Sequence, residues 1–279
     1  MRFRVIDGCR EHYPIRLMCR CLKVSPSGYY AWRARRPGPR AVENAHLTEQ
    51  IETLHADSDG VKGSRRIWRD LRESGQPCGL NRVERLMRVQ GLQGIPQRRK
   101  WRRKAATTRP GGVSNLLERD FRADEPNTRW VTDITYIRTD ESWLYLCVVL
   151  DLATDIVVGW SMAARQDREL VLRAVLMALG QRPGAGPTIL HSDRGAQFTS
   201  DEYQRFLRDH GLRSSMSAVG SCADNAAAEG FFGRLKRERV NRRTYRTRAE
   251  ARTDVFDYIE CVHNADRRRR LKPSAVLST

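Results

Sequence analysis

A run of basic residues near the middle of the chain limits what the chain can fold into more than any other feature. Between Arg98 and Arg109 seven residues are basic and none is acidic, and Pro110-Gly111-Gly112 follows directly. Such a stretch has too few apolar side chains to form a core, so we interpret residues 98–122 as a basic, flexible linker. We therefore expect separately folded regions before and after it.

The charge balance indicates a polyanionic partner. The chain has 51 Lys and Arg residues against 33 acidic ones, a formal net charge of +18. Such a surplus repels itself unless a polyanion shares it, so nucleic acid is the first partner to consider. An acidic membrane surface is the alternative, but the longest apolar run, Trp143 to Leu150, has only eight residues, too few to span a bilayer. Early charges exclude a signal-peptide core, and we expect a cytoplasmic protein.

The seven cysteines are scattered, and no two have C-x-x-C spacing. In a reducing compartment they are expected to be ordinary thiols. Cys9, His12, Cys19 and Cys21 are close enough in sequence to raise the question of a zinc site. Structural zinc sites usually consist of two spaced pairs of ligands, so thiols remain the expected state.

Helical periodicity dominates the region before the linker. Leu47, Ile51 and Leu54 recur at the spacing of one apolar helix face. A second helix is expected over residues 64–73, and a third is expected to begin at Asn81, capped by that side chain. A smaller helical segment over residues 1–42 precedes them, with a helix start at Ser25-Pro26.

The third helix of this region has a basic face. Arg82, Arg85 and Arg88 form a stripe separate from its apolar positions. A helix, a turn and a further helix with an arginine face predict a helix-turn-helix-like DNA-binding domain over residues 43–97. A solvated basic face on a plain helical bundle is the alternative.

After the linker the pattern changes to strands. Residues 129–138 are rich in β-branched and aromatic side chains, and two more apolar runs cover residues 143–150 and 156–162. A helix over residues 167–180 and a short strand over residues 187–190 follow, and helical patterns continue beyond them. Three strands, then helix, strand and helices, predict an α/β domain with a mixed sheet.

Three acidic residues in this region are candidate functional residues. Asp133 lies in the middle of a predicted strand, where a hydrogen-bond network or a metal ion must compensate its burial. Asp193 follows the short strand, where ligand sites gather in α/β sheets, although an ordinary turn is the alternative. Glu229 lies in a predicted helix with Lys236 two turns further on nearly the same face. On such a face the carboxylate can hold a metal ion and the ammonium can contact a DNA phosphate. A solvated helix face is the alternative.

Other acids in the same region have simpler interpretations. Asp151 and Asp155 are expected to be turn residues, and Asp224 is expected to cap the helix that contains Glu229. None of them is therefore a candidate ligand.

Spacing and local motifs together resemble a known family. Asp133 lies in Trp-Val-Thr-Asp-Ile-Thr-Tyr, Asp193 in His-Ser-Asp-Arg-Gly-x-Gln-Phe and Glu229 in Asp-Asn-Ala-x-x-Glu-x-Phe-Phe, with 35 residues between the last two acids. This pattern resembles the acidic triad of retroviral-integrase-type transposases, and most of all the second reading-frame product of the bacterial insertion-sequence-three family. The likeness covers nearly the whole chain, including the ending from His263-Asn264 to Pro273. Val61-Lys62-Gly63 departs from the family's usual Tyr-Gly pair, and the tail is unusually rich in arginine.

The resemblance implies a fold and an activity. The expected fold is a ribonuclease-H-like mixed sheet with flanking helices over residues 123–279, an integrase-like catalytic core with a C-terminal helical extension. The implied activity is metal-dependent cleavage of DNA at the ends of an insertion sequence, followed by strand transfer from the freed 3′-hydroxyl. Asp133, Asp193 and Glu229 are then catalytic residues and ligands of Mg²⁺, for which Mn²⁺ substitutes, with two ions in the site.

The resemblance also implies partners. These are double-stranded DNA at the element ends and the target, a second copy of the chain, and an upstream reading-frame product joined by fusion or association; no membrane partner is expected. In the cell the protein would be associated with the nucleoid. The candidate DNA-contacting residues near the acids, on the third helix and in the linker are Lys236, Gln197, Arg194, Arg82, Arg85, Arg88, Arg99, Lys100, Arg102, Arg103 and Lys104.

Two other functions stay open at this point. The chain could be a DNA-binding regulator with a catalytically silent sheet domain, or a related nuclease that cuts but does not join. The complete triad argues against the regulator, whereas the nuclease differs only in its product.

Overall fold

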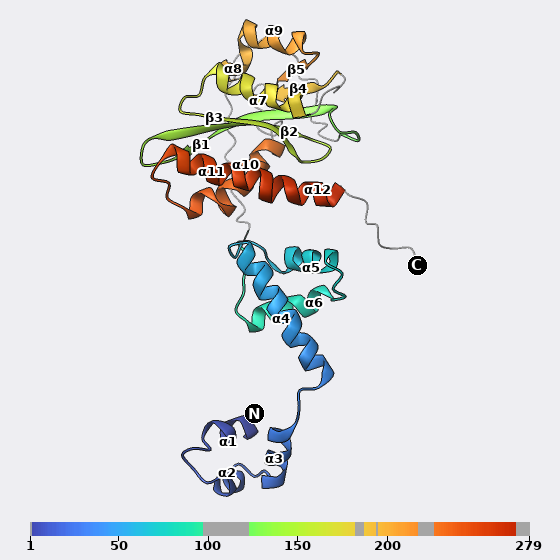
Figure 1. Cartoon of the computed structure of the whole chain (residues 1–279), viewed down its shortest axis with the longest axis vertical. Helices are drawn as coiled ribbons and strands as arrows, with labels where there is room; N and C mark the ends of the chain where they lie inside the picture. Colours follow the sequence, from blue (N-terminus) through green and yellow to red (C-terminus); the bar gives the residue numbers. More distant parts are fainter. Residues whose placement is uncertain (1, 97–122, 182–186, 194, 217–225, 272–279) are drawn as a thin grey trace, which may run out of the picture. The chain divides into compact units, whose positions relative to one another are not determined.

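The chain forms two compact units, Met1–Gln97 and Arg98–Thr279. The computed structural model describes residues 2–96, 123–181, 187–193, 195–216 and 226–271 (Figure 1). The linker predicted over residues 98–122 lies outside the described residues. Each unit has its own apolar cores and is described by itself.

The first three helices of the first unit share a small core. They are α1 (Arg2–Gly8), α2 (Ile15–Cys21) and α3 (Pro26–Ala34). Their fully buried side chains include Cys19 and Tyr29. Helix α3 begins as predicted at Ser25-Pro26, since the Ser25 hydroxyl accepts a hydrogen bond from the Gly28 amide.

A second core in this unit is formed by α4 (Pro39–Asp57), α5 (Ser64–Glu73) and α6 (Leu80–Val89). The periodic residues Leu47 and Ile51 pack there against apolar side chains of α5 and α6. The predicted Asn81 cap is wrong, because α6 begins one residue earlier, at Leu80, with Gly79 as the capping residue and no side-chain cap. Asn81 therefore lies inside the helix, where it cannot take the capping position.

The segment Val61-Lys62-Gly63, which departs from the family pattern, is well packed. Gly94 approaches it so closely that an added Cβ would lie 2.3 Å from the Gly63 nitrogen. The Ile95 amide donates to the Val61 carbonyl over 3.3 Å, and Lys62 pairs with Asp70 at 2.5 Å. These contacts tie the start of α5 to the residues after α6 and preserve the packing of the two helices.

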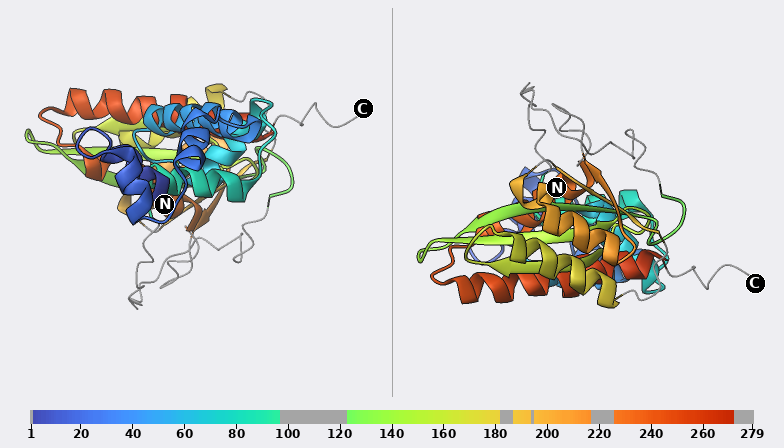
Figure 2. Two further views of the ribbon diagram at one scale, coloured as in Figure 1. Left: turned by 90° about the horizontal axis from the view of Figure 1, so that it is seen from below. Right: turned by 90° about the horizontal axis from the view of Figure 1, so that it is seen from above.

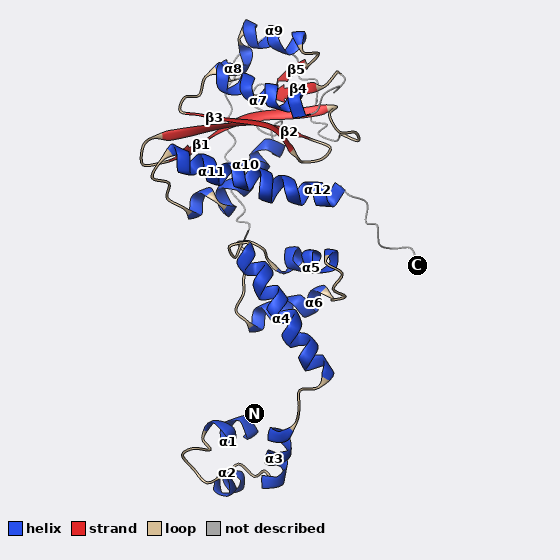
Figure 3. Ribbon diagram, viewed as in Figure 1, coloured by secondary structure: helices blue, strands red, loops and turns tan. Residues whose placement is uncertain are grey.

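The second unit is built on a five-stranded mixed sheet with strand order β3-β2-β1-β4-β5 (Figure 3, red). The strands are β1 (Arg129–Arg138), β2 (Trp143–Asp151), β3 (Val157–Ala163), β4 (Ile189–Ser192) and β5 (Arg213–Met216). The first three are antiparallel neighbours, whereas β4 runs parallel to both β1 and β5. Strand β4 begins two residues later than predicted, at the point where its pairing with Arg129 begins.

Helices cover both faces of this sheet (Figure 1). On one face lie α7 (Arg168–Gln181), α8 (Ala196–Thr199) and α9 (Asp201–Asp209), packed on a core that includes Trp130. Helix α7 lies over the strands in the right-hand view of Figure 2. It packs so closely on Gly159 of β3 that a Cβ added to this glycine would lie 2.2 Å from the Ala174 carbonyl oxygen.

The other face is covered by α10 (Ala226–Glu238), the 3-10 turn η2 (Val240–Arg242), α11 (Arg248–Asp257), the π-helical turn η3 (Tyr258–Asn264) and α12 (Ala265–Leu271). The predicted fold, a mixed sheet with flanking helices after a helical N-terminal region, is confirmed. Across the part of the chain that the structure describes, every helix is too short or too polar to cross a lipid bilayer.

The C-terminal elements are fastened to the edge strand β3. The Asn264 side chain accepts from the Val157 amide over 2.9 Å and donates to its carbonyl over 3.0 Å, as a neighbouring strand would. Beside it, the His263 ring lies 2.8 Å from the Asp155 carbonyl oxygen and packs on Phe231 of α10. Burial, and then the positive charge of Arg234, lower the pKa of His263 to about 4, so the ring is neutral at pH 7.

Candidate active site

The sheet register brings Asp133 and Asp193 together. Strands β1 and β4 pair in parallel, with Val131 level with His191. Asp193 follows directly after β4, which ends at Ser192, and Asp133 lies two residues beyond the last paired residue of β1. Paired residues on neighbouring strands project from the same face of a sheet, about 4.8 Å apart. Two acids with 59 residues between them in the sequence therefore lie near each other, and the charge of Asp193 raises the pKa of Asp133.

Helix α10 brings Glu229 to the same place. Alternation along β1 puts Asp133 on the face of Val131 and Ile137, both of which belong to the core under α10. Helix α10 packs on β1 through buried side chains that include Ala228. Glu229 follows Ala228 in the first turn and is exposed at the edge of that contact.

The electrostatics of Asp133 show that the three acids interact. Burial is the main reason that the pKa of Asp133 rises from 3.8 to about 7, and the negative charges of Asp193 and Glu229 raise it further. A hydrogen bond of 2.8 Å from the Ile134 amide and the charge of Lys236 oppose the rise. Among the described residues no side chain donates a hydrogen bond to Asp133. Within the described part of the chain, the Ile134 amide and the charge of Lys236 are the groups that offset this carboxylate.

A turn holds Asp193 at the end of β4. Its carboxylate accepts a hydrogen bond of 3.0 Å from the Gly195 amide. An added Cβ on Gly195 would lie 3.1 Å from that carboxylate and 2.9 Å from the side-chain oxygen of Gln197. Glycine therefore leaves room for both side chains, and the turn keeps the Asp193 carboxylate exposed.

Lys236 occupies the predicted place, two turns after Glu229 on α10. Its charge lowers the pKa of Asp133, and its ammonium lies 4.7 Å above the centre of the Tyr136 ring. One lysine thus connects the acids with an aromatic side chain further along β1.

The three carboxylates approach one another without forming a ready-made metal site. Across the described part of the chain, no three His, Cys, Asp or Glu side chains are gathered closely enough to hold an ion. The donor set consists of hard oxygens, which fit Mg²⁺ or Mn²⁺.

Three family models match parts of the chain. Residues 42–100 match an HTH-like domain. Residues 123–222 and 229–277 match two families that are both described as integrase core domains.

Curated relatives cover almost the full length. Transposase InsF for insertion sequence IS3A of Escherichia coli K12 is 40% identical over 273 residues, which are 96% of this chain and 94% of that relative. The chain belongs to the IS3 family of insertion-sequence transposases. A 31 kDa protein of insertion element IS600 from Shigella sonnei is 38% identical over 90% of this chain and 92% of its own length.

Family membership confirms the predicted transposase with an integrase-type catalytic core and a helix-turn-helix region. Among solved structures, the magnesium complex of the HTLV-2 integrase catalytic core domain is 23% identical, with a TM-score of 0.35, over 41% of this chain and 70% of that chain.

The other acids of this IS3-family chain have structural partners. Asp151 is fully buried at the end of β2 and accepts hydrogen bonds from the Asn127 amide and from both the amide and the hydroxyl of Thr154. Asp155 has a positive φ of 53° and pairs with Arg234 and Arg267. Both hold the turn between β2 and β3, as predicted, whereas Asp224 lies outside the described residues.

The predicted DNA-contacting residues fall into three groups. Arg82 is half-buried and donates to Asn44 and Glu43 of α4, whereas Arg85 and Arg88 are exposed. Near the acids, the Gln197 side chain lies 3.4 Å from the Gln166 carbonyl oxygen. Five linker residues and one residue near Asp193 lie outside the described residues, namely Arg99, Lys100, Arg102, Arg103, Lys104 and Arg194.

The different environments of these α6 arginines predict different effects of replacing them. Replacing Arg85 and Arg88 together with alanine is expected to weaken binding to duplex DNA. It should also make the plot of log binding constant against log salt concentration less steep by about 2, because each phosphate contact contributes about 0.9 to the steepness. Arg82→Ala is expected instead to lower the free energy of unfolding by about 1 kcal/mol, through its lost bonds to α4. Binding titrations across a salt series and chemical denaturation measure the two effects, and an unchanged salt slope in the double variant would contradict the DNA contact.

Proposed function

We propose that this chain cuts and joins DNA strands at the ends of an insertion sequence, and that Asp133, Asp193 and Glu229 are its catalytic residues. The observation that carries the proposal is the half-buried Asp133 carboxylate, whose pKa is raised by the negative charges of Asp193 and Glu229 as well as by its burial. Neighbouring carboxylates, one of them half-buried, cost free energy that a bound cation would offset.

The cation is Mg²⁺, for which Mn²⁺ substitutes, and the three carboxylates hold two ions. When bound, such ions activate the attacking oxygen and stabilise the leaving oxygen of an in-line displacement at phosphorus. Because Asp193 and Glu229 are exposed, they can move toward a cation, whereas Asp133 is fixed in its strand.

The residues of the chain position the DNA for two successive displacements. Lys236 binds a phosphate beside the acids. Water first attacks the phosphodiester at the element end, and the bond that breaks frees a 3′-hydroxyl. That hydroxyl then attacks a phosphodiester of the second DNA segment and displaces a new 3′-hydroxyl. The first step consumes one water and turns a phosphodiester into a 5′-phosphate and a 3′-hydroxyl. The second step exchanges one phosphodiester and one 3′-hydroxyl for another of each, and neither step forms a covalent protein–DNA bond.

The partners follow from this reaction. The substrates are double-stranded DNA at the two element ends and in the target, bound also by α6 and the basic residues 98–109. Two ends must react together, so a second copy of the chain takes part in the reacting complex. The product of an upstream reading frame, fused or associated, supplies further DNA binding.

An Asp193→Asn variant tests the assignment. Purified full-length chain with Mg²⁺ or Mn²⁺ is expected to join labelled duplexes that carry the inverted repeats flanking its gene. Asp193→Asn should reduce joining by at least about 10³-fold, because metal and phosphate charge are no longer balanced, while binding persists. Asp209→Asn, an exposed acid at the end of α9, is the matched control and should join normally.

Each other outcome identifies a different error. Undiminished joining by Asp193→Asn contradicts the role of that residue. A wild-type chain that cuts without joining would be a nuclease, and one that binds element ends without cutting would be a regulator.

A further inference from the structure

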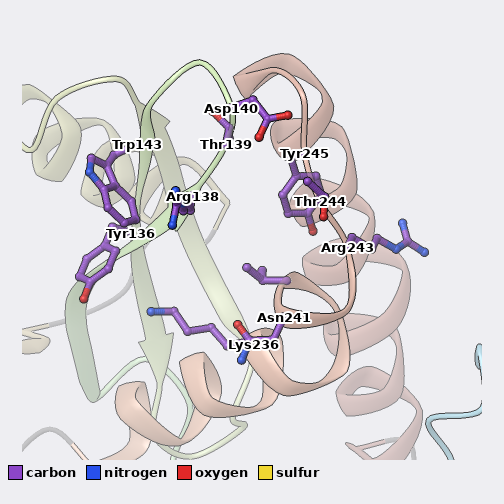
Figure 4. A pocket seen from close by; sticks show the side chains of 11 residues that line it. Tyr136, Arg138, Thr139, Asp140, Trp143, Lys236, Asn241, Arg243, Thr244 and Tyr245 are labelled. Atoms are coloured by element: carbon purple, nitrogen blue, oxygen red, sulfur yellow. The ribbon is translucent and has the colours of Figure 1, made fainter.

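The structure contains a pocket next to the acids that the catalytic roles do not use. Its volume is about 500 Å³, within the range of pockets that hold small organic groups. It lies between the β1–β2 hairpin and the residues that follow α10, and the side chains lining it are labelled in Figure 4. At one end of the pocket, the Asp140 amide of the hairpin donates a hydrogen bond to the Tyr245 carbonyl.

The pocket combines an aromatic wall with positive charge. Tyr136 and Trp143 meet edge to face with 5.1 Å between ring centres, yet they remain 57% and 42% exposed. Arg138 and Lys236 add positive charge from β1 and α10. Exposed aromatic rings beside cations are what proteins use to bind unpaired bases and their phosphates.

The pocket and the acids are connected by Lys236 and by an open strand edge. Strand β4 pairs with β1 only from Arg129 to Val131. Beyond Val131, that edge of β1 pairs with no strand in the described part of the chain. Tyr136 lies three residues after Asp133, about 10 Å along the strand and on the opposite face of the sheet. Lys236 is near both, because its ammonium lies over the Tyr136 ring and its charge lowers the pKa of Asp133.

The two ends of the pocket differ in charge. In the view of Figure 4, Lys236 reaches toward Tyr136 at one end, and Asp140 lies at the opposite end near Thr139. A phosphate suits the first end. Base amino groups, which donate hydrogen bonds, suit the second end, where the exposed Asp140 carboxylate offers acceptors.

We propose that this pocket binds one unpaired nucleotide of the DNA strand that is held at the acids, with its base on the Tyr136–Trp143 pair and its phosphate at Lys236. The proposal rests on the proposed function, because it takes the strand at the acids as its substrate. A paired base cannot lie on these rings, since its faces are stacked inside the duplex. The nucleotide beside the reacting phosphodiester therefore leaves the duplex and enters the pocket.

Binding without chemistry tests the proposal. In EDTA, the full-length chain is titrated with a duplex that ends in a short single-stranded extension containing 2-aminopurine, and with the blunt duplex of the same sequence. We expect the extended duplex to bind about ten-fold more tightly, with quenching of the 2-aminopurine as it stacks. Tyr136→Ala combined with Trp143→Ala should remove both the preference and the quenching.

Matched variants separate stacking from folding. Tyr136→Phe combined with Trp143→Phe keeps the rings and should keep the preference. Phe256→Ala removes an equally exposed ring that packs on Trp160 of the same unit and should also keep it. If the double alanine variant fails to fold, Arg138→Glu places a negative charge at an exposed pocket position and should reduce the preference instead.

Several outcomes would overturn the proposal. One is an unchanged preference in the double alanine variant, and another is an equal loss of affinity for blunt and extended duplexes. A third is free deoxyadenosine monophosphate competing as well as the extension does, which would indicate a site for a free nucleotide. A chain that never joins DNA but shows the expected preference would keep the pocket and refute the proposed function, whereas normal joining without the preference would do the opposite.

Discussion

Replacing Asp133 with asparagine is expected to raise the melting temperature of the metal-free protein above pH 7 and to abolish DNA joining. Burial, and then repulsion by Asp193 and Glu229, raise the pKa of Asp133 to about 7. Asparagine has the same shape, can still accept the hydrogen bond from the Ile134 amide and carries no charge. The substitution therefore removes an electrostatic cost together with the metal ligand, as functional residues that reduce stability commonly do.

The sign and the pH range follow from the pKa of Asp133. An acid whose folded-state pKa is raised destabilises the fold wherever it is ionised. The cost is fully present above pH 7, shrinks as the pH falls, and disappears below the ordinary value of 3.8. A shift of about three pH units corresponds to at most about 4 kcal/mol. The stability gain of Asp133→Asn should therefore be large at pH 8 and vanish toward pH 4.

Thermal unfolding in EDTA between pH 4 and pH 8 measures this gain, with Asp209→Asn as the control that should behave as wild type. Added Mn²⁺ or Mg²⁺ should then stabilise the wild type and leave Asp133→Asn unchanged, because binding to the folded state raises its stability. A lower melting temperature for Asp133→Asn at pH 8 would mean that Asp133 belongs to a structural hydrogen-bond network.

Local patterns were sufficient to predict most of the elements. The β-branched run over residues 129–138 and the amphipathic stretch over residues 64–73 appear in the structure with the predicted bounds. Both signals arise within a single segment, from the alternation of a half-buried strand and the period of a helix. The roles of Asp151 and Asp155 in a turn could be predicted for the same reason.

The features that depend on distant parts of the chain could not be predicted in this way. The pairing of β4 with β1 sets the start of β4 and brings Asp193, directly after that strand, near Asp133, and no local pattern encodes that register. Arg82 belongs to the predicted basic stripe, yet α4 supplies its partners. The exposed pair Tyr136–Trp143 was missed because each residue fits a strand pattern, and only the hairpin brings them together.

Replacing Asn264 with alanine is expected to lower the stability of the second unit by about 3 kcal/mol. The Asn264 side chain is fully buried, and its two bonds to Val157 satisfy both backbone polar groups of that residue on the outer side of β3. Alanine leaves the amide and the carbonyl buried without partners, each at a cost of about 1–3 kcal/mol. For a unit of this size the melting temperature should fall by about 10 °C.

The loss should exceed that of any one ordinary side-chain hydrogen bond, because Asn264 replaces a missing neighbouring strand. Gln181→Ala, which removes an exposed amide at the end of α7, is the control and should change the melting temperature little. Calorimetry of the full-length chain distinguishes the two variants. A fall in the Asn264→Ala variant no larger than in the control would mean that water satisfies the edge of β3. In that case the contact between η3 and α10, through His263 and Phe231, would be what fastens the C-terminal helices to the sheet.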